Sequence, residues 1–116
     1  MREKIRDSQR LEHILKALDT LIRYRQDYTD DEIIYNPITF FGFVKHLEIV
    51  GEAAYKLTKE FKDNHPEIEW QVLEGMRHIM VHGYYTIEKN IVLSTLREDV
   101  DILRESIIRI LNNINF

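Results

Sequence analysis

The sequence has no cysteine among its 116 residues. A disulfide framework, a thiolate metal site and nucleophilic cysteine chemistry are therefore excluded. Because disulfides mark oxidising compartments, we expect a cytoplasmic location. The charged N-terminal segment, from Met1 to Asp7, lacks the apolar stretch of a secretory signal and agrees with this expectation.

Long apolar runs and an excess of positive charge are also missing. The uncharged residues around Phe40 form a stretch far shorter than the roughly 18 apolar residues of a membrane span, so no membrane partner is expected. The formal net charge is −4, which argues against broad, charge-driven binding to nucleic acid but not against a local basic cleft. With 44% hydrophobic and 31% charged residues, the composition is that of a globular protein rather than a disordered or collagen-like chain.

Turn-forming residues are scarce as well, since the chain holds four glycines, two prolines and no Asn-Gly or Asp-Gly pair. β-Hairpins therefore have no turn signal, and long helices remain. Without an internal repeat, residues 1–116 are expected to form a single domain. The sequence predicts an all-α fold, a four-to-five-helix up-and-down bundle.

Apolar residues recur at three- and four-residue spacing in four segments, which predicts four long helices. Their expected spans are residues 7–28, 37–62, 70–82 and 88–113. Asp7 or Ser8 is expected to cap the first helix. Asn36 followed by Pro37 marks the start of the second helix. Residues 29–31 are expected to form a polar connection between these two helices.

Gly42 and Gly51 lie inside the second predicted helix, where each costs about 1 kcal/mol relative to alanine. A close crossing with another helix is a physical reason to keep them. The same helix is apolar on more than one side, and a chain of this length would have difficulty burying all of that surface. We therefore expect a homodimer, with a well-filled monomeric core as the alternative.

The segment from Arg77 to Tyr84 concentrates chemistry-bearing side chains at the end of the third predicted helix, which Gly83 is expected to stop. It contains a permanent cation, two imidazoles and a phenol: Arg77, His78, His82 and Tyr84. The two histidines are four residues apart and share a helical face, whereas Arg77 and His82 lie roughly 140° apart around an ideal helix. One chain does not obviously bring these two to one point, but two copies across a symmetry axis would.

Arginine with histidine and no metal suits the cleavage of RNA, whose 2′-hydroxyl is a built-in nucleophile. A histidine, with an ordinary pKa of about 6.5, can take the proton of that hydroxyl or protonate the leaving 5′-oxygen. The planar donors of arginine match phosphate oxygens and stabilise the charge that develops on the phosphorane. The segment therefore indicates a metal-independent ribonuclease site.

Each of these residues also has a purely structural interpretation. Arg77 could pair with Glu74 or with a neighbouring helix, and His82 could be a polar helix end beside the macrodipole. Tyr84 could be an aromatic residue at the edge of the core. His78 with His82 could be half of a zinc site, but no third ligand has convincing spacing.

The spacing Arg-x4-His-x-Tyr, here Arg77, His82 and Tyr84, resembles the signature of the HEPN superfamily and, more narrowly, of the HepT-like toxins of HepT–MntA toxin–antitoxin systems. The resemblance extends to three flanking segments, residues 47–54, 65–70 and 75–77. These segments read Leu-Glu-Ile-Val-Gly-Glu-Ala-Ala, His-Pro-Glu-Ile-Glu-Trp and Gly-Met-Arg. The motif alone is a weak pattern, but with these segments in order it is specific.

The resemblance implies a HEPN-like, dimeric endoribonuclease toxin that uses no metal and no cofactor. It implies that Arg77 and His82 are the catalytic pair and that RNA, not DNA, is the substrate. The family residue after the arginine is most often asparagine. Here it is His78, whose role stays open between contacting the phosphate, sharing proton transfer and orienting Arg77. The usual partner is a minimal nucleotidyltransferase antitoxin of the MntA type, and Tyr84 is where such antitoxins attach AMP.

Two other interpretations compete with the ribonuclease. The chain could be a non-catalytic HEPN module that serves as partner or scaffold for a nucleotidyltransferase. It could also be a structural helical bundle without a site, in which case replacing Arg77 or His82 would change stability alone. The intact set of Arg77, His82 and Tyr84 favours the ribonuclease.

Overall fold

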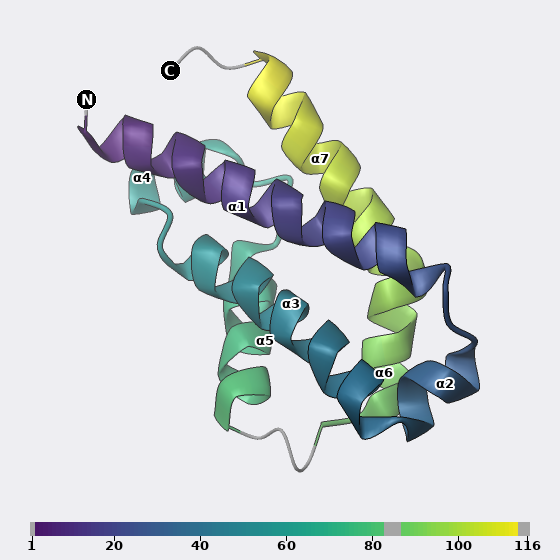
Figure 1. Cartoon of the computed structure of the whole chain (residues 1–116). Helices are drawn as coiled ribbons and strands as arrows, with labels where there is room; N and C mark the ends of the chain where they lie inside the picture. Colours follow the sequence, from purple (N-terminus) through teal and green to yellow (C-terminus); the bar gives the residue numbers. More distant parts are fainter. Residues whose placement is uncertain (1, 83–86, 114–116) are drawn as a thin grey trace.

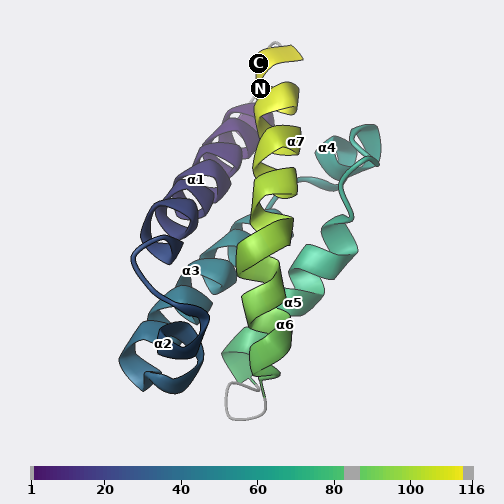
Figure 2. The ribbon, with the colours of Figure 1, turned by 90° about the vertical axis from the view of Figure 1, so that its right-hand side faces the viewer.

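The computed structural model describes residues 2–82 and 87–113, with side chains described over 6–75, 77 and 87–113. The regular elements among these residues are all helices, and the expectation of an all-α fold is confirmed. The elements in chain order are α1 (Arg2–Arg25), α2 (Asp30–Tyr35), α3 (Pro37–Tyr55), α4 (Lys59–Asn64), α5 (Trp70–His82), α6 (Lys89–Ser94), a π-helical turn η2 (Thr95–Asp99) and α7 (Val100–Asn113). Figures 1 and 2 show that α6 and α7 follow each other as one long rod beside α1.

The first helix starts earlier than the sequence analysis predicted, because α1 begins at Arg2 and neither Asp7 nor Ser8 caps it. Asp7 is instead buried, with 3% of its surface exposed. Its carboxylate accepts hydrogen bonds from the backbone N–H of Thr58 at 2.9 Å and from the Thr58 hydroxyl at 2.6 Å. Asp7 therefore ties α1 to the start of α4, a contact between distant residues that local capping rules do not anticipate.

The expected polar connection at residues 29–31 is wrong, since Asp30 begins the short helix α2. Thr29 and Glu32 form a capping box: the Thr29 hydroxyl accepts from the Glu32 N–H at 3.2 Å, and the Glu32 carboxylate accepts from the Thr29 N–H at 2.8 Å. The Thr-x-x-Glu spacing is a sequence signal for a helix start, so α2 could have been predicted. Its single buried residue, Ile33, fastens the helix to the core.

The second predicted helix begins where expected, with the Asn36 side chain accepting from two backbone N–H groups of the first turn and Pro37 at the first position. It does not continue to Lys62. The structure splits it into α3 and α4, with Leu57 buried between them and Thr58 capping α4. A threonine that accepts a hydrogen bond from Phe61 N–H at 3.2 Å offers the backbone an alternative to continuing the helix.

The third predicted helix is confirmed, since α5 spans Trp70–His82. The fourth covers the expected range but contains η2, the π-helical turn. In this turn the carbonyl of Leu96 accepts a hydrogen bond from Arg25 at 2.8 Å, and Arg25 also binds both carboxylate oxygens of Asp101. Arg25, the last residue of α1, therefore binds to the π-helical turn. The spacing of apolar residues in the sequence does not predict this turn.

The core lies where α1, α3, α5 and the α6–α7 rod face one another. Helix α3 packs against both α1 and α5, and α1 also packs against α7. The fully buried side chains are large and aliphatic, as expected for close-packed helices: Leu11, Ile14, Leu18, Leu21, Ile33, Leu47, Val50, Val92, Leu96 and Ile107. Because α3 is central, its two sides face different neighbours, and this arrangement positions the site described next (Figure 1).

Candidate active site

Arg77 lies on α5 where this helix makes its closest approach to α3. A Cβ atom added at Gly51 would stand 2.5 Å from the Cβ of Arg77 and 2.9 Å from the carbonyl oxygen of Leu73. Any side chain at position 51 would therefore push the two helices apart. The prediction that Gly51 serves a close helix crossing is confirmed, and its partner in that crossing is the predicted catalytic arginine.

The same prediction is wrong for Gly42, because a Cβ added there would meet no atom within 4 Å. Gly42 is exposed on the first half of α3, and no packing contact among the described residues requires the missing side chain. The two glycines look alike in the sequence, but only one of them lies at a crossing.

The guanidinium of Arg77 is held by an ion pair with Glu52 on the adjacent turn of α3. Its Nε–H donates to Oε2 of the Glu52 carboxylate, and the two side chains are 28% and 38% exposed. This hydrogen bond raises the pKa of Arg77 and lowers the pKa of Glu52, so both groups are charged at neutral pH. Lys56 adds a second cation, with its Nζ 3.5 Å from the other oxygen of Glu52.

Tyr55, the last residue of α3, places its aromatic ring against the guanidinium of Arg77. The central carbon of the Arg77 guanidinium lies 4.5 Å from the centroid of the Tyr55 ring, a cation–π contact. Tyr55 is 54% exposed, so the contact is open to solvent on one side. Among the described residues no hydrogen bond involves the Nη1 or Nη2 groups of Arg77. The arginine is thus held at Nε by Glu52, and no described residue binds its outer donors.

The alternative pairing of Arg77 with Glu74 is wrong. Glu74 binds Lys62 instead, with 2.5 Å between its carboxylate oxygen and Nζ. The other structural alternative, a pairing of Arg77 with a neighbouring helix, describes the observed geometry. That pairing uses only the Nε side of the guanidinium, so it leaves room for a further ligand.

The remaining predicted site residues are only partly placed. The backbone of α5 is helical through His82, so His78 and His82 share a helical face as expected from their spacing. Their side chains lie outside the described residues, as do Gly83 and Tyr84. The structure therefore brings Arg77 together with Glu52 and Tyr55, and the position of the histidine side chains stays a prediction.

Sequence reasoning named the segment that contains Glu52 but gave this residue no role, and it did not single out Tyr55. Glu52 and Arg77 are separated by 25 positions, so no local spacing rule links them. The available signal was the pair of Gly51 and Glu52 inside a helix, because a glycine at a crossing places its neighbour beside the facing helix.

No metal site is evident among the residues with described side chains, where no three histidine or acidic side chains gather closely enough to hold an ion. Within the described ranges, no helix is both long and apolar enough to cross a membrane.

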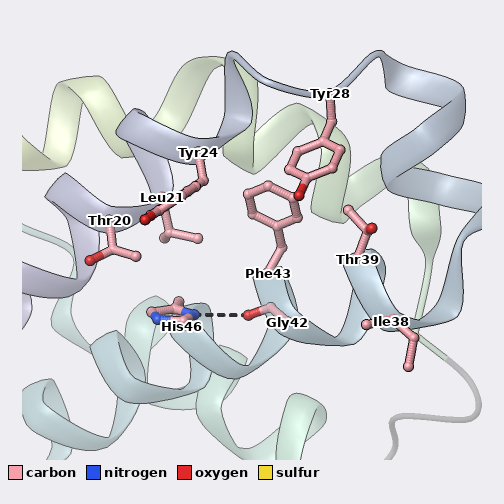
Figure 3. A pocket seen from close by; sticks show the side chains of 9 residues that line it. All are labelled: Thr20, Leu21, Tyr24, Tyr28, Ile38, Thr39, Gly42, Phe43 and His46. Atoms are coloured by element: carbon pink, nitrogen blue, oxygen red, sulfur yellow. Dashed lines mark hydrogen bonds between the residues drawn. The ribbon is translucent and has the colours of Figure 1, made fainter.

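A hollow of about 400 Å³ lies between α1 and the first half of α3, away from Arg77 (Figure 3). Its walls are largely aromatic, with the rings of Tyr28 and Phe43 in edge-to-face contact at 6.0 Å. The imidazole Nδ1 of His46 lies 2.9 Å from the carbonyl oxygen of Gly42, and both residues line the hollow. The hollow offers aromatic surface but no group of charges suited to catalysis.

Comparisons with known proteins agree with the motif. The model of the family described as Ribonuclease HepT-like matches residues 14–110. A protein of Caldanaerobacter subterraneus subsp. tengcongensis, provisionally named an RNase, is 32% identical over 87% of this chain and 90% of its own length. A protein of Thermococcus cleftensis, provisionally named ribonuclease HepT, is 29% identical over 81% of this chain and 86% of its own. No solved structure matches the chain.

The fold, the arginine at the close crossing and the extent of the family match agree with one another. The match includes α3, α4 and α5 in full, and therefore both Arg77 and the residues that hold it. The chain belongs to the family of HepT-like ribonucleases.

Proposed function

We propose that this ribonuclease cleaves RNA by attack of the 2′-hydroxyl on the adjacent phosphate, with Arg77 and His82 as the catalytic pair. The observation that carries the proposal is the state of Arg77, which is fixed at Nε by Glu52 while its Nη groups have no hydrogen bond among the described residues. A guanidinium held in this way presents two parallel donors to phosphate oxygens without having to be ordered first.

In this mechanism Arg77 binds the non-bridging phosphate oxygens and stabilises the additional negative charge of the phosphorane. His82 transfers protons, taking one from the 2′-hydroxyl or giving one to the leaving 5′-oxygen. Glu52 is a positioning residue, because it touches Arg77 and not the reacting atoms. His78 sits beside Arg77 in sequence, and we assign it a supporting role in binding the phosphate.

We further propose that the active enzyme is a homodimer in which two Arg77–Tyr84 segments line one groove. Large apolar side chains stand exposed at the end of the molecule formed by α2 and the start of α3: Tyr35 is 73% and Ile38 is 85% exposed. Burying such surface against a second copy would stabilise a dimer. It would also let the arginine of one protomer act with the histidine of its partner.

Regulation by a nucleotidyltransferase antitoxin completes the proposal and rests on the family motif. Transfer of an AMP group from ATP to the Tyr84 hydroxyl, with release of pyrophosphate, would place a phosphate and an adenosine near Arg77. The added phosphate would compete with RNA for the same guanidinium donors. Inhibition is therefore expected without loss of the fold.

The test of the chemistry compares purified wild-type protein with single variants on RNA and on DNA of the same sequence. We expect RNA alone to be cut, with 2′,3′-cyclic phosphate and 5′-hydroxyl ends, and EDTA to have no effect. Arg77→Ala and His82→Ala should each slow cleavage by about 10²–10³-fold while keeping the helical circular dichroism spectrum. His78→Asn should be milder, because it restores the commoner family residue.

Full activity of His82→Ala, or a strict requirement for magnesium, would contradict this mechanism. Wild-type protein that leaves RNA intact would support the non-catalytic HEPN module instead. For the dimer, a light-scattering mass of 14.0 kDa, that of one chain, would contradict the proposal. For the regulation, co-expression with a nucleotidyltransferase of the MntA type should add the mass of AMP to Tyr84, and an adduct elsewhere would exclude that site.

A further inference from the structure

A second groove, formed by α1 and the last half of α3, has Glu52 but not Arg77 in its wall. It encloses about 180 Å³, roughly six times the volume of a water molecule in the liquid, so a phosphodiester group fits within it. The lining residues come from both helices: Arg10, His13, Lys45, Glu48, Ile49, Glu52, Ala53 and Lys56. Glu52 therefore belongs to the wall of this groove and to the ion pair of the active site.

The groove is positive in a protein that is negative as a whole. Three cations, Arg10, Lys45 and Lys56, face two carboxylates, Glu48 and Glu52, so the groove carries +1 with His13 neutral. The whole chain carries −4. A local concentration of positive charge on an acidic protein is the pattern expected of a specific phosphate contact rather than of general attraction to nucleic acid.

The charges of the groove differ in how far they are already compensated. The Nζ of Lys45 lies 3.2 Å from Oε1 of Glu48, and the Nζ of Lys56 lies 3.5 Å from Oε1 of Glu52. For Arg10 no ion pair or hydrogen bond occurs with any described residue, and its Nε is buried without a hydrogen-bond partner. A buried donor without a partner is uncommon in a folded protein, so Arg10 is a cation that no described group of the protein compensates.

We propose that this groove binds a backbone phosphate of the RNA strand next to the phosphate that is cleaved, with Arg10 as the main contact. The inference rests on the proposed function, since it takes the cleaved phosphate to lie at Arg77. Because Glu52 belongs both to the ion pair with Arg77 and to the wall of the groove, a strand that passes over Glu52 would meet Arg77 and then Arg10. The contact is to the backbone, so it adds affinity and fixes the register of the strand without selecting a base.

The test measures binding without cleavage, so that it does not depend on catalysis. Fluorescence anisotropy with a 2′-O-methyl RNA oligonucleotide reports affinity, because this RNA has no 2′-hydroxyl to attack. Arg10→Gln should weaken binding by about three- to tenfold and lower the slope of log affinity against log salt by about 0.7 to 1. Arg10→Lys should retain most of the affinity, since the charge remains.

Lys16→Gln is the matched control, because it removes one exposed charge from the same helix α1 but lies outside the groove. It should bind as the wild type does, and thermal unfolding of all variants should show that each is folded. Equal loss in Arg10→Gln and Lys16→Gln, or no loss in either, would overturn the groove assignment. If the wild type cleaves unmodified RNA and Arg10→Gln binds normally, only this inference fails. If the wild type leaves unmodified RNA uncut, the proposed function fails.

Discussion

The two halves of α3 differ in how closely they approach other parts of the protein. The difference is clearest at their glycines, Gly51 and Gly42. At Gly51 the helix touches α5 so closely that a Cβ atom would stand 2.5 Å from that of Arg77, and Glu52 and Tyr55 on the next turns hold the guanidinium. At Gly42 a Cβ atom would meet nothing within 4 Å, and the helix borders the open aromatic hollow of Figure 3.

The difference teaches that a glycine within a helix has no fixed meaning. At Gly51 the missing side chain brings the backbone of α3 close to Arg77, the proposed catalytic arginine, so the local cost in helix stability is offset by packing. At Gly42 the cost has no compensation within the described part of the chain. If Arg77 acts as proposed, catalysis should depend on the half of α3 that contains Gly51, and substitutions in the half that contains Gly42 should leave the site intact.

The largest loss of RNA cleavage activity in this comparison is expected for Gly51→Ala. The added methyl group must displace Arg77 or the backbone of α5, and a shift of about 1 Å in a catalytic group can cost about 10²-fold in rate. We expect RNA cleavage to fall by about that factor, as measured by single-turnover kinetics, with a lower unfolding temperature. Unchanged activity in this variant would show that the crossing does not position Arg77.

Glu52→Gln comes next, with an expected loss of about tenfold in cleavage rate because the guanidinium loses its charged anchor. Asp19→Asn is the matched control, since it weakens another Arg–carboxylate contact between helices, with Arg104 at 2.6 Å, far from the site in sequence. Stability should change little in either variant, because partly exposed ion pairs contribute little. Equal losses of activity in both variants would remove the special role of Glu52.

The same ion pair has a defined pH dependence. The pKa of Glu52 is lowered in the folded protein relative to its ordinary value of 4.5, so its stabilising contribution is fully present above pH 4.5. This contribution is lost as the pH falls through the lower, folded-state pKa. Glu52→Gln should therefore unfold at a slightly lower temperature than the wild type at neutral pH, and this small difference should vanish under acid conditions.

Tyr55→Leu should reduce the cleavage rate by about two- to fivefold, because a cation–π contact at an exposed site contributes only about 0.5–1 kcal/mol. Tyr24→Leu removes a similar contact, with Arg23 at 5.2 Å from the ring, beside the open half of α3. Cleavage by this control should match the wild type. A larger loss of cleavage rate in Tyr24→Leu than in Tyr55→Leu would contradict the view that the half of α3 near Gly51 supports the site.

Gly42→Ala should have the smallest effect on activity and should raise stability by about 1 kcal/mol, the usual gain of alanine over glycine in a helix. Chemical denaturation measures the gain. A light-scattering mass below that of the wild type, together with loss of activity, would instead show that another surface approaches Gly42 closely.

The sequence predicts what depends on neighbouring residues and misses what depends on distant ones. Asn36 with Pro37 and the span of α5 follow from local capping and apolar spacing, and both are confirmed. The break at Thr58 depends on its contact with Asp7, which is remote in sequence, and no periodic pattern contains it. For the same reason the pattern identifies Arg77 as a candidate but not Glu52 as its partner.

The central claim is that Arg77, anchored at Nε by Glu52, supplies the donors that stabilise the cleaved phosphate. Its most direct test is the single-turnover cleavage rate of Arg77→Lys on RNA, because lysine keeps the positive charge but loses the planar, anchored fork. We predict a rate about 10²-fold below that of the wild type, with the helical fold and the light-scattering mass unchanged. A rate equal to that of the wild type would contradict the claim, since any cation at this position would then suffice.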